Sequence, residues 1–151
     1  MKIPQEFPQF KEKKAVLIVT SNQEARFLLA ENGVIEEFDS FEISKPHYSD
    51  REGFFMRRSG GKVLGSGSVY EQKKEKIKQD FFREFRKSIK KPFLKKADLI
   101  YLFCPGYLSN EIKENMDNLL KDKIEGSFRG NYFTEHPLRF LELIKKKTIK
   151  I

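Results

Sequence analysis

Residues 14–43 read KAVLIVTSNQEARFLLAENGVIEEFDSFEI, and this stretch determines the fold more than any other part of the chain. Its first seven residues are largely a β-branched apolar run, which predicts a buried strand. Residues 25–31 form a second run of strand character, and residues 34–43 form a third. Asn32-Gly33 joins the last two runs and predicts a tight type I′ turn, because both central residues of that turn need positive φ. We therefore expect the chain to open with an antiparallel meander.

The alternation of side chains predicts which face each strand buries. Ala25, Phe27 and Leu29 fall on one side of the second strand and are expected to share its buried face. Along the third strand, strict alternation places Phe38 and Asp39 on opposite faces. We expect Asp39 to face solvent.

Downstream of residue 70, helical and extended patterns alternate. Residues 71–91 predict an amphipathic helix, and residues 97–104 are apolar on both faces, which is typical of a central parallel strand. Ser109 is the expected cap of a second helix, residues 124–133 predict a weak edge strand, and Pro137 opens a last helix. The side chains expected to be buried in these three helices are Ile77, Phe81, Phe82, Phe85, Ile89, Ile112, Met116, Leu119, Leu120, Leu138, Leu141 and Ile144.

This order of elements predicts the fold class. Three antiparallel strands followed by alternating helices and strands give a β-β-β-α-β-α-β-α order and a mixed five-stranded sheet. The same order occurs in ribonuclease H-like folds. We expect a lead at residues 1–13, pinned to the core by Phe7 and Phe10, and one α/β domain at residues 14–151 with a long loop at residues 44–70.

The distribution of charge indicates an anionic partner. The chain has a formal net charge of +8, and residues 73–96 hold eleven Lys or Arg against three Asp or Glu. Such a local basic field favours nucleic acid or an anionic surface. The N-terminal residues lack the apolar core of a signal peptide, and no apolar run reaches membrane-spanning length. We expect a cytoplasmic protein without membrane insertion.

Candidate catalytic and metal-binding residues are few. The single Cys104 excludes an internal disulfide or a cysteine metal cluster, and it is expected to be a buried thiol. A two-metal nuclease needs clustered carboxylates, but residues 14–20 contain none and Asp98 precedes its strand. His47 lies in no recognisable catalytic motif, and His136 is an expected helix cap. The sequence predicts no metal, no cofactor and no catalytic constellation.

Four segments resemble the bacterial and archaeal host attachment protein family, which is related to the middle domain of eukaryotic and archaeal release factors and of Pelota. They are VTSNQEARFLLAENGVIEEF (residues 19–38), SDREG (49–53), FFREF (81–85) and LIYLFCPGYL (99–108). The resemblance implies an α/β domain with a place in translation or ribosome rescue. Release factors carry a Gly-Gly-Gln tripeptide in a neighbouring domain. Here Gly60-Gly61 is followed by Lys62, so the resemblance implies no peptidyl-tRNA hydrolysis.

The leading hypothesis is a non-enzymatic module that binds RNA or the ribosome. Its expected phosphate contacts are Arg51, Arg57, Arg58, Lys62, Lys76, Arg83, Lys87 and Lys90. Its expected stacking or partner contacts are Phe54, Phe55 and Tyr70. Two alternatives stay open: a hydrolase or nuclease acting on a phosphate-containing substrate in the sheet cleft, and a protein-interaction or homodimerisation domain in which Phe54, Phe55 and Met56 dock a partner.

Overall fold

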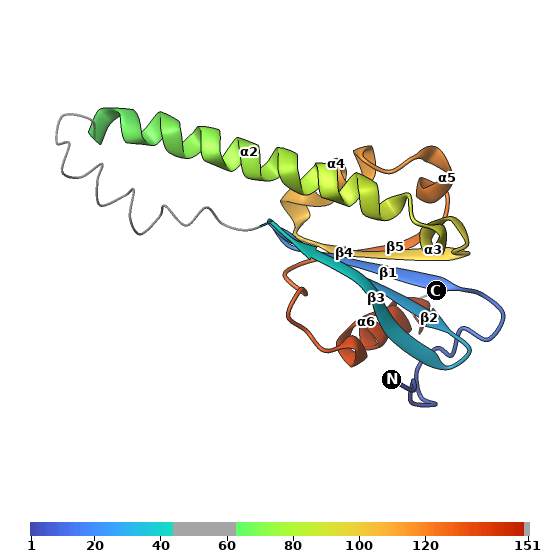
Figure 1. Cartoon of the computed structure of the whole chain (residues 1–151). Coiled ribbons are helices and arrows are strands. Elements are labelled where there is room, and N and C mark those ends of the chain that lie inside the picture. The colour runs from blue at the N-terminus through green and yellow to red at the C-terminus, as the bar shows by residue number, and fades with distance from the viewer. Residues whose placement is uncertain (44–62, 150–151) are drawn as a thin grey trace.

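The computed structural model describes residues 1–43 and 63–149 (Figure 1). The five strands are β1 (Ala15–Thr20), β2 (Glu24–Glu31), β3 (Val34–Glu42), β4 (Leu99–Cys104) and β5 (Ile124–Arg129). The helices are α2 (Val63–Ile89), α3 (Pro92–Lys95), the 3-10 helix η2 (Gly106–Leu108), α4 (Ser109–Glu114), α5 (Asn118–Lys121) and α6 (Pro137–Ile149).

The strands form one mixed sheet in the order β3-β2-β1-β4-β5. The pairs β3–β2 and β2–β1 are antiparallel, whereas β4 runs parallel to both β1 and β5. The predicted fold class is therefore confirmed, including the meander, the central parallel strand and the edge position of β5. Helices α2 to α5 cover one face of the sheet, and α6 covers the other (Figure 1).

Each face of the sheet has its own apolar core. On the α2 face, Phe81 and Phe85 pack against Phe27, whose ring lies 6.2 Å from that of Phe85. On the α6 face, Phe103 packs against Phe140 with 4.9 Å between ring centroids. Both sides of β1 and β4 are thus buried, which agrees with their uninterrupted apolar sequences.

A β-bulge at Phe38 changes the faces of β3. Phe27 pairs with Asp39 but Leu28 pairs with Glu37, so Phe38 is the extra residue. The bulge places Phe38 and Asp39 on the α2 face together, because a one-residue insertion reverses the alternation beyond it. The expectation that Asp39 faces solvent is therefore wrong. Its side chain is 16% exposed and accepts a hydrogen bond from Lys91 Nζ at 2.8 Å.

Helix α2 begins earlier than its sequence predicts. Residues 63–70, which were expected to belong to a loop at residues 44–70, are helical. Gly65 and Gly67 each disfavour a helix by about 1 kcal/mol relative to Ala, which is why propensity predicts a later start. Extending an existing helix requires much less free energy than nucleating one, so the amphipathic segment that follows can support helical turns at residues 63–70. Residues 44–62 lie outside the described part of the chain.

The segment after β4 also departs from prediction. In place of one helix, the chain forms η2, α4 and α5, and the Asp117 side chain caps α5 by accepting from Leu120 N at 2.9 Å. Ser109 is buried and makes no capping bond, because Leu108 occupies the cap position of α4. The break before α5 rotates Leu119 outward, so its predicted burial is wrong and the residue is 75% exposed.

The N-terminal lead packs on the α6 face. Lys2 bridges to Val34 at the outer edge of β3, and Ile3 is buried. Phe7 and Phe10 are partly buried and pack against this core, so both side chains pin the lead as expected. The lead therefore protects the start of an edge strand that would otherwise expose unpaired backbone groups.

Candidate nucleic-acid interface

The outer side of α2 carries the exposed cations Lys76, Arg83 and Lys87, and exposed Lys90 follows directly after the last residue of the helix. We call these four residues the cationic ridge. Their positions follow from helical geometry, because Phe81 and Phe85 hold the opposite side of the helix against the sheet. The N-terminal turns of α2 extend past the edge of the sheet (Figure 1). The ridge therefore lies on the side of the helix that faces away from the sheet.

Two members of the ridge are paired with acidic neighbours. Arg83 Nη2 lies 2.5 Å from Asp80 Oδ1, and Lys87 Nζ lies 3.3 Å from Glu84 Oε1. Both pairs are exposed and span one helical turn, so each contributes at most about 1 kcal/mol and competes weakly with a phosphate. The i,i+3 spacing of both pairs is visible in the sequence, although the predicted phosphate contacts did not take these pairs into account.

Lys76 and Lys90 form no ion pair with any residue in the described part of the chain. They are the members of the ridge whose charge is not offset by a neighbour in contact. An anion that binds either lysine therefore displaces no carboxylate of the described residues. Substitutions of these two lysines therefore test anion binding by the ridge without breaking an ion pair.

Other cations of α2 hold the helix in place. Lys78 Nζ donates to Glu111 Oε1 of α4 at 2.7 Å, and Arg86 Nη1 donates to Asn115 Oδ1 at 2.7 Å. The pKa of Lys78 is raised, first because of its hydrogen bond to Glu111 and then because of the negative charges of Glu111 and Glu75. These two residues fix α4 against α2 and were not predicted as structural contacts.

The remaining predicted site residues fall in several places. Tyr70 lies in α2. Arg51, Arg57, Arg58, Lys62, Phe54, Phe55 and Met56 lie outside the described residues, as does His47. His136 is confirmed as a cap, because its Nδ1 accepts from Leu138 N at 3.1 Å. The structure thus places Lys76, Arg83 and Lys87 on one side of α2 and Lys90 just beyond its end, and their role in binding stays a prediction.

A shallow groove separates α2 from the end of β3. Its lining residues are Phe41, Glu42, Ile43, Asp80, Arg83 and Glu84. Across residues 1–43 and 63–149, no group of three or more His, Cys, Asp or Glu side chains is arranged to hold a metal ion. In the same residues, no helix has both the length and the apolar character needed to cross a membrane.

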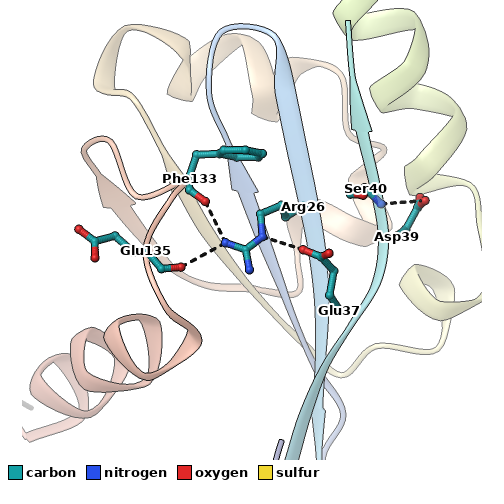
Figure 2. Close-up of polar contacts among 6 residues, drawn as sticks. All are labelled: Arg26, Glu37, Asp39, Ser40, Phe133 and Glu135. Atoms are coloured by element: carbon teal, nitrogen blue, oxygen red, sulfur yellow. Dashed lines mark hydrogen bonds and ion pairs between the residues drawn. The ribbon is translucent and has the colours of Figure 1, made fainter.

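Arg26 organises the opposite face of the sheet (Figure 2). Its Nε donates to Glu37 Oε1 at 2.6 Å, and its Nη1 donates to the carbonyl oxygens of Phe133 and Glu135 at 2.8 and 3.2 Å. The guanidinium also lies over the rings of Phe133 and Phe140. Arg26 therefore ties β2 and β3 to the connection between β5 and α6.

We expect Arg26→Met to lower the free energy of unfolding by about 1.5–3 kcal/mol, because hydrogen bonds to a charged group are lost and two carbonyls lose this donor. Urea denaturation measures the change. Arg139→Met is the matched control, since Arg139 pairs with Glu142 at 3.4 Å on the exposed side of α6 and should contribute less than about 1 kcal/mol. Equal effects of the two substitutions would contradict the clamping role of Arg26.

Comparison with known proteins places the fold. No protein-family model matches the chain, and no curated protein sequence matches it. Among solved structures, the archaeal translation termination factor aRF1 aligns with a TM-score of 0.51 and 14% identity, covering 91% of this chain and 41% of that factor. The chain is thus an α/β domain similar in fold to part of a translation termination factor.

A second structure, that of Dom34 from S. cerevisiae, is described as a translation termination-like factor involved in RNA quality control that interacts with Hbs1. It aligns with a TM-score of 0.46 and 11% identity, covering 94% of this chain and 40% of Dom34. The chain therefore spans about two fifths of the length of each factor. At these identities the similarity concerns the fold alone, and the resemblance to host attachment proteins stays a prediction.

Proposed function

We propose that this chain is a cytoplasmic, non-enzymatic module of translation that binds structured RNA, in the ribosome or in tRNA, through the cationic ridge of α2. The observation that supports it is the exposed ridge itself, with Lys76 and Lys90 free of ion pairs within the described residues. Lysine and arginine side chains on one helix face suit the phosphates of an RNA backbone, because binding releases condensed counterions.

Two further features support the proposal. The fold is similar to part of an archaeal translation termination factor. The sequence segments that resemble host attachment proteins point to the same class, and on this proposal the chain is a member of that family. The basic segment at residues 51–62, outside the described residues, would extend the same interface with Arg51, Arg57, Arg58 and Lys62.

Co-sedimentation with ribosomal particles tests the proposed function. The tagged chain is expressed in cells, and the lysate is fractionated on a sucrose gradient at low and at high salt. We expect the chain to migrate with ribosomal subunits or ribosomes at low salt and to return to the top of the gradient at high salt, because the contacts are ionic.

Nuclease treatment separates RNA-mediated association from protein contacts. The proposal predicts that ribonuclease digestion releases the chain from the heavy fractions. If the chain stays at the top of the gradient even at low salt and binds no purified ribosomal RNA or tRNA, the proposed function is wrong.

A further inference from the structure

Phe93 in α3 is an aromatic ring held on one side and open on the other. Its ring stacks on that of Phe38, with 4.7 Å between centroids and 27° between planes. The residue is nevertheless 48% exposed, although α3 also contributes the fully buried Leu94. The ring of Phe38 is thus a platform that fixes the orientation of an exposed ring.

The surroundings of Phe93 are cationic. Residues 88–97 hold four lysines and no acidic residue. Lys91 is paired with Asp39, whereas Lys90, Lys95 and Lys96 make no ion pair within the described residues and are exposed. Lys123 Nζ donates to the backbone oxygen of Lys95 at 2.9 Å, which brings a further ammonium group to α3.

This combination suits a nucleotide better than an apolar protein surface. A protein-docking patch usually exposes several hundred square ångströms of contiguous apolar area, whereas α3 exposes one ring among ammonium groups. Sites for single-stranded nucleic acid differ from such a patch: a base stacks on an exposed aromatic ring, and neighbouring cations bind the phosphates. Lys90 belongs both to this surrounding and to the cationic ridge, so the two surfaces are continuous.

We propose that Phe93, with Lys90 and Lys96, forms a stacking site for an unpaired base of the RNA that the cationic ridge contacts. The inference rests on the proposed function and narrows its substrate to RNA with a loop, a bulge or a free end. The sequence assigned stacking to Phe54, Phe55 and Tyr70, whereas the orientation of Phe93 is fixed by its contact with the ring of Phe38.

The test compares two RNAs of equal length, a hairpin with 2-aminopurine in its loop and a fully paired duplex. Phe93→Leu keeps apolar cover over Phe38 but removes the flat ring. We expect it to bind the hairpin about tenfold more weakly than the native chain and to lose the quenching of 2-aminopurine, with duplex affinity unchanged. Phe93→Tyr should retain both the affinity and the quenching.

Tyr107→Leu is the matched control, because Tyr107 is an aromatic residue that is 69% exposed. It follows the C-terminal end of β4, whereas Phe93 in α3 precedes the N-terminal end of the same strand. It should bind both RNAs as the native chain does. The proposed stacking site is wrong if Phe93→Leu retains hairpin affinity and quenching, or if it weakens the binding of hairpin and duplex equally. Either result leaves the proposed RNA binding by the cationic ridge uncontradicted. If the native chain binds neither RNA, the proposed function itself fails.

Discussion

Phe85→Ala is expected to lower the free energy of unfolding by about 3–5 kcal/mol, because it removes a fully buried ring and leaves a cavity. Phe85 contacts rings on both sides of the helix–sheet interface: its centroid lies 6.2 Å from that of Phe27 on β2 and 6.2 Å from that of Phe81 on α2. A domain of this size is stable by about 5–15 kcal/mol, so the variant would be close to unfolding. Urea denaturation followed by circular dichroism measures the loss.

Tyr107→Ala provides the control for removing an aromatic ring from the surface. Tyr107 is largely exposed, and its hydroxyl donates to Asn22 Oδ1. We expect a loss of about 1 kcal/mol or less for this variant. A comparably small effect of Phe85→Ala would show that the apolar side of α2 does not lie on the sheet. It would also contradict the conclusion that the cationic ridge faces away from the sheet.

The double variant Lys76→Glu with Lys90→Glu is expected to bind RNA about ten- to a hundredfold more weakly at moderate salt, because two phosphate contacts are replaced by repulsion. These positions are preferred over Arg83 and Lys87, whose reversal would also set like charges beside Asp80 and Glu84. Fluorescence anisotropy with a labelled RNA hairpin measures the change. Neutral replacement of Arg83 and Lys87 by Gln should weaken binding less.

A control of equal charge separates a local contact from a general field. Lys11→Glu with Lys13→Glu makes the same change in net charge on the N-terminal lead, whose Phe7 and Phe10 pack on the α6 face. Since exposed charges are screened beyond about 10 Å at 0.1 M salt, the lead variant should keep most of its affinity. Equal losses in both double variants would argue against a ridge that contacts the RNA directly.

Local periodicity predicted most of the framework. The Asn32-Gly33 turn has positive φ at both residues, as its sequence requires. The four-residue spacing of Phe81, Phe85 and Ile89 placed the buried side of α2, and thereby the exposed side, because a helix advances about 100° per residue. These predictions depend only on neighbours within one or two turns of the chain.

Features that depend on distant contacts were missed. The bulge at Phe38 places Asp39 beside Lys91, 52 positions later in the chain. The contact between Phe38 and Phe93 likewise joins residues that are distant in the sequence. No alternation rule reveals where a bulge inserts its extra residue. Arg26 likewise finds its partners 107 and 109 positions away, so the sequence indicated a strand residue but not its clamping contacts.

The candidate interface was partly predictable for the same reason. Its helical cations were found from spacing alone, and the pairs Asp80–Arg83 and Glu84–Lys87 could have been found from their i,i+3 separation. Phe93 carried no such signal, because a single helical turn has too few residues for a periodic pattern.

The salt dependence of RNA binding tests the central claim most directly. Association constants are measured for the native chain and for the Lys76→Glu, Lys90→Glu variant between low and physiological salt. With four ridge phosphate contacts, the logarithm of the constant should fall with the logarithm of salt at a slope of about −3 for the native chain, and at about −1.5 for the variant, which keeps two of the contacts. A native slope near zero, or the same slope in both proteins, would contradict an interface formed by the cationic ridge.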